Sequence, residues 1–455
     1  MNATPVIDIG TVKDAAPLSR THILIVALCA GVMFFDGLDL LTISFAAPAI
    51  GKALGLLPQQ VGLMFSAGLV GLGVGGLLQG PFSDRLGRKP MLVACVILFG
   101  VGTWLTALAT SFPSLMTYRF IAGLGLGAAT PVVLTLVTDS CPARLRAPLS
   151  MVMYCGLMVG GLFGGLLTAL TSGPLGWQGV FEIGGFLPLL YVPVLLWCLP
   201  ESVEFLTLKG GRDPQVGRTL QRLVPGFEPV AGARYVSAAS STAKGSLMRL
   251  FRGELRARTW VTSLGFLCTL MSLYFYASWL PALMRGIGLS EGQSIAITLS
   301  GQVGNLVGSL LIARLMMSWP PYKVITVTYV GAALALVAVS LGGPNFALQM
   351  GLNFLVGVFL SGSLNGFTSL TPQLYPADLR ATGTGWARSV GYIGAVIGPG
   401  VAGALMARQW TAEGLFQLAA VPPLLAALTC LVLAVLVVAG PRRGALATAT
   451  ARAPG

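Results

Sequence analysis

Long apolar runs of 20 or more residues follow one another along the 455-residue chain, with short polar segments between them. Because about 20 apolar residues in a helix cross the hydrocarbon of a bilayer, each run predicts one membrane-spanning helix. A transmembrane β-barrel would instead show alternating segments of about ten residues. The pattern predicts an all-α integral membrane protein with twelve spans, at about 23–45, 59–80, 90–110, 114–138, 147–171, 179–199, 260–284, 293–316, 322–342, 346–371, 380–407 and 412–440.

A long polar segment separates the first six spans from the last six. We therefore expect an N-terminal tail, a six-helix bundle, a central loop, a second six-helix bundle and a C-terminal tail, at 1–22, 23–199, 200–259, 260–440 and 441–455. The two halves repeat each other, because residues 141–147 read CPARLRA and residues 375–381 read YPADLRA at equivalent places in each half. Parallel repeats of this kind hold a binding site between them near the membrane midplane.

Composition supports the membrane assignment and excludes several other classes. The chain is 55% hydrophobic and only 9% charged, whereas soluble domains carry about 25% charged residues. His22 is the only histidine, and the seven cysteines show no metal-ligand spacing, so we expect neither a metal nor a cofactor. No HExxH motif is present, and we do not expect an enzyme.

The net charge of +13 reflects topology and attraction to anionic lipid rather than binding to nucleic acid. If both termini face the cytoplasm, the external loops contain only Lys52, Arg285 and Arg408. Arg119 and Arg388 lie within spans, and the other basic residues lie at or beyond the cytoplasmic ends of spans. Positive charge stays cytoplasmic, so the sequence predicts cytoplasmic termini.

The first span contains two carboxylates, Asp36 and Asp39, within the sequence MFFDGLDLL. Residues three apart on a helix project from nearly the same face. Each ionised aspartate near the bilayer centre costs roughly 2.5–3.5 kcal/mol on insertion scales, which marks a functional position. We interpret the pair as a cation or proton site that faces a polar cavity; the alternative is an exterior loop with a misplaced span boundary.

Arg119 begins the fourth span in an RxxxGxGxG pattern whose glycines allow close helix approach. At 1.5 Å per residue it lies roughly 7 Å below the outer face of a ~30 Å core. Asp36 and Asp39 lie roughly 20–24 Å above the inner face, which is the same depth. Arg119 therefore either pairs with one aspartate or extends to the outer interface.

The loop between spans two and three has the most specific motif, GPFSDRLGRK, which contains Gly80, Asp84, Arg85, Gly87, Arg88 and Lys89. A carboxylate followed by arginines in a tight loop can clamp neighbouring helix ends. With twelve spans in two repeated halves, this motif resembles the major facilitator superfamily. The resemblance implies that the loop stabilises one state of alternating access. In the second half Ala313 replaces the acid, so a symmetric clamp is not expected.

Span eleven begins RATGTGWAR and continues GYIGAVIGPG, and together with DGLD in span one it resembles the aromatic acid:proton symporter family. The resemblance implies transport roles for Asp36, Asp39, Arg119 and Arg380. Tyr392 stands where that family often has arginine, and Arg388, one turn earlier, is the candidate replacement. Asp139, at the end of the fourth span, completes the transport-linked set.

Three further side chains are candidates for contact with the substrate. Gln302 and Asn305 lie three apart in span eight and either line a cavity or hydrogen-bond between helices. Tyr276 in span seven offers a ring for stacking on an aromatic substrate.

These features together predict a proton-coupled importer of small aromatic carboxylates in the bacterial inner membrane. Its expected partners are the aromatic anion, protons and the bilayer, and we expect a monomer driven by the proton gradient. A symporter of another organic anion such as nicotinate or a dicarboxylate, a sugar porter, and a membrane sensor on a transporter scaffold are the alternatives.

Overall fold

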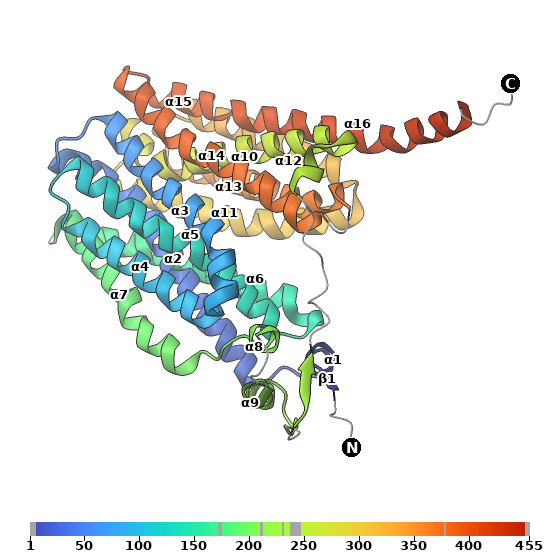
Figure 1. Cartoon of the computed structure of the whole chain (residues 1–455). Coiled ribbons are helices and arrows are strands. Elements are labelled where there is room, and N and C mark those ends of the chain that lie inside the picture. Colours follow the sequence, from blue (N-terminus) through green and yellow to red (C-terminus); the bar gives the residue numbers. More distant parts are fainter. Residues whose placement is uncertain are drawn as a thin grey trace. The chain divides into compact units, whose positions relative to one another are not determined.

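The computed structural model describes residues 6–171, 175–209, 213–229, 232–236, 247–376 and 379–450. Figure 1 shows a helical protein in which the chain runs from blue to red. The elements are β1 (Val6–Asp8), α1 (Ile9–Ala15), α2 (Arg20–Ala53), α3 (Pro58–Leu86), α4 (Arg88–Ala107), α5 (Phe112–Ser140), α6 (Ala143–Thr171), α7 (Gly176–Cys198), α8 (Val203–Leu208), α9 (Asp213–Leu223), β2 (Arg234–Val236), η2 (Leu247–Phe251), α10 (Gly253–Gly286), α11 (Glu291–Ser318), α12 (Pro321–Leu341), α13 (Phe346–Leu370), η3 (Thr371–Leu374), α14 (Arg380–Ala407), α15 (Ala412–Ala419) and α16 (Val421–Thr450).

The predicted all-α membrane fold is confirmed, because twelve spans among the described residues are long and apolar enough to cross a bilayer. They are α2–α7, α10–α14 and the joined pair α15–α16. Several helices extend beyond the apolar runs. For example, α2 begins at Arg20, where Ser19 accepts a hydrogen bond from the backbone N–H of His22, and it continues through Pro48 to Ala53. Hydropathy marks the part of a helix inside the hydrocarbon and misses its ends.

The chain forms two compact units. Unit 1 contains Met1–Gly55 and Ala67–Thr242, and unit 2 contains Leu56–Ser66 and Ala243–Gly455. Most of each unit is one of the six-span halves. The first turns of α3 belong to unit 2 and the rest of that helix to unit 1.

The same close helix contacts recur in both units. In unit 1 an added Cβ on Gly160 of α6 would overlap the backbone of Phe34 in α2. In unit 2 an added Cβ on Gly394 of α14 would overlap the backbone of Leu267 in α10. Because α2 and α6 are the first and fifth spans of their half, as α10 and α14 are of theirs, the packing agrees with the repeat read from the loops.

The described parts of the polar segments at 1–22 and 200–259 contain short helices and strands. β1 pairs in parallel with β2, and both pack with α1, α8 and α9 near the start of α2 (Figure 1). Ile9, Val216, Leu220 and Tyr235 are buried in the same core cluster as the membrane helices. These apolar residues are sparse, so average hydropathy hides them, yet they pack α1, α9 and β2 into the core of unit 1.

Candidate functional site

The centre of unit 1 holds a buried ion pair between Asp39 of α2 and Arg119 of α5. The guanidinium donates to both carboxylate oxygens, from Nη1 to Oδ1 at 2.9 Å and from Nη2 to Oδ2 at 2.7 Å. Thr103 of α4 donates a third hydrogen bond to Oδ1 at 2.8 Å. Asp39 is 3% exposed and Arg119 is 5% exposed. The predicted pairing of Arg119 with one aspartate is therefore confirmed, and the partner is Asp39.

Glycines lie next to both members of this pair. An added Cβ on Gly37, between the two aspartates, would overlap the carbonyl oxygen of Leu157 in α6. Gly68 of α3 lies beside the guanidinium, and its absent Cβ would stand 3.9 Å from Nη2 of Arg119. The glycine between the aspartates therefore allows the close contact of α2 with α6, and a Cβ on Gly68 would make only an ordinary van der Waals contact with the guanidinium.

Asp36 occupies a different environment, one turn before Asp39. It is half-buried, and its Oδ2 accepts a hydrogen bond from Thr130 Oγ1 of α5 at 3.1 Å. Its partner is a neutral hydroxyl, whereas Asp39 has a cation. The two carboxylates of the DGLD sequence therefore have different chemistry although they lie on nearly the same helix face.

The motif at 80–89 is mostly helical, which corrects the prediction of a loop there. α3 continues through Leu86 and α4 begins at Arg88, so the chain turns at Gly87 alone. Gly87 has φ of +111°, a conformation that favours glycine, and an added Cβ would overlap Glu201. Glu201 Oε1 accepts from the backbone N–H groups of Arg88 at 2.9 Å and Lys89 at 3.1 Å. A carboxylate thus caps the start of α4, where the helix dipole favours negative charge.

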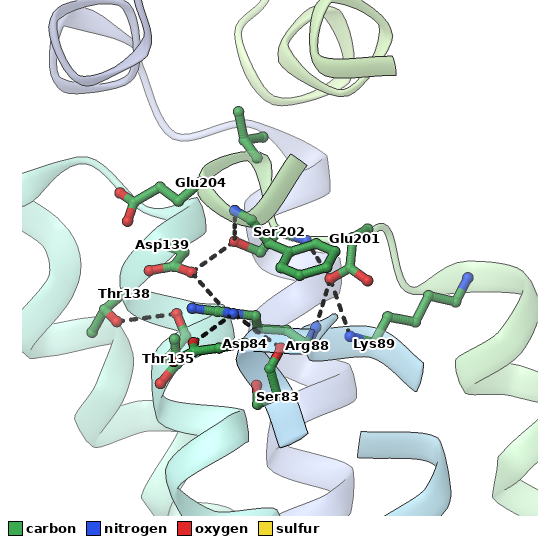
Figure 2. A network of polar contacts seen from close by, with 12 residues as sticks. Ser83, Asp84, Arg88, Lys89, Thr135, Thr138, Asp139, Glu201, Ser202 and Glu204 are labelled. Carbon is green, nitrogen blue, oxygen red and sulfur yellow. Dashed lines mark hydrogen bonds and ion pairs between the residues drawn. The ribbon is translucent and has the colours of Figure 1, made fainter. Parts of the chain in front are cut away.

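Figure 2 shows how the charged side chains of this motif contact neighbouring helix ends. Arg88 lies 3.1 Å from Asp84, one turn earlier, and 3.8 Å from Asp139 at the end of α5. Ser202 donates to Asp139 Oδ2 at 2.7 Å. The remaining motif residues are more peripheral: the side chain of Arg85 is exposed, and the space around an added Cβ on Gly80 is open.

Lys13 of α1 joins this network from the N-terminal segment. Its Nζ lies 2.7 Å from Glu204 Oε1 of α8 and donates to the backbone oxygen of Asp139, also at 2.7 Å. The residue is 1% exposed. The end of α5 is thereby linked to α3 and α4 through Arg88, to α8 through Ser202, and to α1 through Lys13.

The candidates in unit 2 fall into two groups. Asn305 donates to Gln302 at 2.8 Å, and both side chains are half-buried on α11. Tyr276 is buried, and its hydroxyl donates to Asn353 Oδ1 of α13 at 2.5 Å. Gln302 and Asn305 are therefore placed together, while Tyr276 belongs to the interior packing of α10 against α13.

The candidates on α14 lie along one helix. Arg380 is its first residue and is exposed, Arg388 is exposed two turns later, and Tyr392 is half-buried one turn beyond. Asp378, the acid of the YPADLRA sequence, lies outside the described residues.

Sequence reasoning missed several residues of these networks. Thr103 and Thr130 are isolated threonines in apolar spans and gave no signal. Glu201 and Ser202 belong to a recognisable Leu-Pro-Glu-Ser string after span six, and their position next to a helix start could have predicted a cap. Lys13 did not stand out in the sequence, because other polar residues surround it in the N-terminal segment.

Comparisons with known proteins agree with this architecture. The family model of the Major Facilitator Superfamily matches residues 29–345 and 262–454. The chain is 33% identical to the 4-hydroxybenzoate transporter PcaK of Pseudomonas putida, over 92% of this chain and 94% of that protein. It is 34% identical to the gallate transporter of Pseudomonas putida, over 93% and 94% of the two chains.

The fold is also that of a solved structure, the xylose transporter XylE from E. coli in a partially occluded inward-open conformation. The TM-score is 0.70 at 16% identity, and the match covers 90% of this chain and 97% of XylE. The family model and the transporter relatives match most of the chain, and twelve spans lie in two repeated halves. The protein is therefore a transporter rather than an enzyme. The chain belongs to the major facilitator superfamily.

Proposed function

We propose that the protein is a proton-coupled symporter that takes up small aromatic carboxylates by alternating access. The observation that carries this proposal is the buried pair of Asp39 and Arg119, in which one titratable carboxylate accepts hydrogen bonds from both terminal nitrogens of the guanidinium. The names of the two Pseudomonas relatives support the substrate class, since both transport hydroxylated benzoates.

The pair offers a direct way to couple a proton to an anion. A charge buried without its partner is strongly disfavoured, so Arg119 requires a negative group near it. When Asp39 takes up a proton, it stops serving as that group, and the carboxylate of the substrate replaces it. The loaded site then contains one cation and one anion, the same net charge as the empty site. Proton and substrate are thus bound together.

Asp36 is the second candidate for the coupling proton. Its hydrogen bond from Thr130 stabilises the carboxylate less than a bidentate guanidinium does. Because Thr130 is neutral, protonation of Asp36 releases no cation. We therefore assign the coupling step to Asp39 and give Asp36 a supporting electrostatic role.

The site chemistry favours an anion over the alternative substrates. A sugar is neutral and is bound by neutral hydrogen-bonding groups. It has no charge to replace the carboxylate that holds the buried arginine. A symporter of another organic anion such as nicotinate uses the same arginine, and competition decides between it and an aromatic acid. We place the protein in the bacterial inner membrane with both termini cytoplasmic, because nearly all basic residues then lie on the cytoplasmic side.

Uptake of labelled 4-hydroxybenzoate into proteoliposomes with an acidic exterior tests this proposal. We expect accumulation that collapses when the pH gradient is dissipated, and competition by benzoate and gallate but not by xylose. Asp39→Asn should abolish gradient-driven accumulation, since the residue can no longer exchange a proton. Glu413→Gln, which neutralises an exposed carboxylate at the start of α15, is the matched control and should accumulate normally. Accumulation that persists in Asp39→Asn would contradict the assignment.

A further inference from the structure

One threonine of α4 takes part in the buried pair of Asp39 and Arg119, although the coupling step proposed above does not use it. Thr103 is 2% exposed, and its Oγ1 donates to Asp39 Oδ1 at 2.8 Å. The same oxygen accepts from Arg119 Nη1 at 2.9 Å, and Oδ2 accepts from Arg119 Nη2 at 2.7 Å. The ionised carboxylate therefore has three donors, of which two belong to the guanidinium and one is a hydroxyl.

The hydroxyl of Thr103 is used differently from that of Thr106, the other threonine of α4. Thr106 is fully buried and donates to the backbone oxygen of Gly102, four residues earlier, at 2.9 Å. Threonines inside helices commonly satisfy their hydroxyl in this way. A hydroxyl has one hydrogen, so the bond of Thr103 to Asp39 takes the place of such a backbone bond.

The residues on either side of Thr103 lie at close helix contacts. An added Cβ on Gly102 would overlap the backbone of Ala122 in α5. An added Cβ on Gly185 of α7 would overlap the backbone of Trp104. Helix α4 therefore packs closely against both α5 and α7 at the level of Thr103, and main-chain packing determines where the threonine lies.

Few other charges act on Asp39. Among the described residues, Arg119 is the charged side chain that is hydrogen-bonded to it, and Asp36 lies one turn earlier on α2. The other charged side chains and the histidine of α2–α7 lie near helix ends or, for Glu182 of α7, on the exposed surface; those near the ends are Arg20, His22, Lys52, Asp84, Arg85, Arg88, Lys89, Asp139, Arg144 and Arg146. Protonation of Asp39 is therefore governed by the donors from Arg119 and Thr103 and by the charge of Asp36.

The hydroxyl of Thr103 can bond to either protonation state of Asp39, but not with equal strength. With the carboxylate it forms a charge-assisted hydrogen bond, which is roughly twice as strong as one between neutral groups. With the protonated acid the bond is between two neutral groups. The hydroxyl therefore favours the ionised form, which must be restored at the end of each transport cycle.

We propose that Thr103 is a positioning residue that promotes release of the coupling proton from Asp39 to the cytoplasm. This inference rests on the proposed function, in which Asp39 carries that proton. Once the substrate has left, the O–H bond of the Asp39 carboxyl breaks and its proton passes to water. The carboxylate keeps the electron pair and returns to its bonds with Arg119 and Thr103. Without the hydroxyl, the ionised form loses a stronger bond than the protonated form does, so release becomes less favourable.

The test compares net uptake with exchange in proteoliposomes. Net uptake of labelled 4-hydroxybenzoate, driven by the pH gradient, requires the proton to leave Asp39 in every cycle. Exchange of unlabelled internal substrate for labelled external substrate does not, because the loaded site can return with its proton bound. In Thr103→Val, which keeps the shape of the side chain, net uptake should fall at least about threefold, equivalent to about half a pH unit, while exchange stays at the wild-type rate. A more alkaline interior should restore net uptake in this variant, because it draws the proton away.

Three further variants separate the hydroxyl from the packing of the side chain. Thr103→Ser keeps the hydroxyl and should match the wild type in both assays. Thr103→Ala is smaller than threonine and should show the same split as Thr103→Val. Thr106→Val is the matched control on the same helix, because its lost hydroxyl donates to the backbone, and it should leave both rates unchanged.

Exchange at the wild-type rate shows that a variant is folded. The inference is overturned if Thr103→Val and Thr103→Ala lose net uptake and exchange in equal proportion, or if both keep wild-type net uptake. A Thr103→Ser variant as slow in net uptake as Thr103→Val overturns it as well. In each of these cases the proposed function stands. A wild type whose uptake ignores the pH gradient overturns both.

Discussion

At the scale of single residues, the proposed coupling of proton and substrate depends on how two neighbouring aspartates differ. Asp39 faces a guanidinium and a hydroxyl, from Arg119 and Thr103, whereas Asp36 has the hydroxyl of Thr130. The same helix therefore holds one carboxylate that is locked to a cation and one that is held weakly. The first can release a cation when it is protonated, and this is the chemistry that symport of an anion needs.

The buried pair leads to a prediction about stability. Arg119→Gln should destabilise the protein by about 3–5 kcal/mol, because Asp39 is left buried without its cation. The double variant Asp39→Asn with Arg119→Gln should regain most of that loss, since two neutral amides can hydrogen-bond in place of the ion pair. Thermal unfolding in detergent measures both values.

Transport separates the pair's structural role from its coupling role. The double variant should remain inactive in gradient-driven uptake although it is stable. A double variant as unstable as Arg119→Gln alone would contradict the account, because it would mean that the unpaired charge is not the source of the loss.

The sequence could predict part of this site. Charged residues in apolar spans stand out, so Asp36, Asp39 and Arg119 were found, and helix rise placed them at one depth. The choice between the two aspartates lay beyond that argument, since one turn of helix is smaller than the uncertainty of a span boundary. Thr103 and Thr130 were missed because hydroxyls are common in apolar spans.

At the scale of elements, the N-terminal segment and the first part of the polar segment after α7, with α8, α9 and β2, belong to unit 1. Sequence analysis predicted a tail and a loop there, because average hydropathy is low in both. The structure has β1, α1, α8 and α9 there, and buried residues of α1, α8 and α9 lie in the same core cluster as those of the long helices of unit 1. Similarly, α3 continues through Leu86, into the motif at 80–89. The predicted span ended at residue 80, because a span predicted from hydropathy stops where polar residues begin.

Lys13 tests whether this N-terminal segment matters to the transporter. Lys13→Met should destabilise the protein by about 1–3 kcal/mol, because Glu204 and the end of α5 lose a buried charged donor. Lys13→Arg should retain most of the stability, since it keeps the charge. Unfolding in detergent and the initial rate of uptake measure the effect.

Lys52→Met, at the exposed end of α2, removes a lysine without a buried partner and serves as the control for Lys13. If Lys13→Met and Lys52→Met have the same free energy of unfolding, the contact of Lys13 contributes nothing to stability. A rate loss restored by Lys13→Arg would show that the charge, and not only the packing, is required.

At the scale of the whole molecule, one helical plan is used twice for different chemistry. Equivalent first and fifth spans pack through glycines in both units, which agrees with the duplicated six-helix halves that the repeated loops predicted. Unit 1 carries the ion pair of Asp39 and Arg119, while Tyr276, Asn353 and Asn365 in unit 2 are neutral. The repeat is thus one of backbone packing, and these polar side chains differ between the halves.

The central claim is that Asp39 carries the proton that enters with each substrate anion. Its most direct measurement is the pH inside proteoliposomes, followed with a trapped fluorescent indicator when 4-hydroxybenzoate is added outside. The account predicts rapid acidification of the interior by the wild type and by Glu413→Gln, and none by Asp39→Asn. Substrate-driven acidification by Asp39→Asn at the wild-type rate would contradict it.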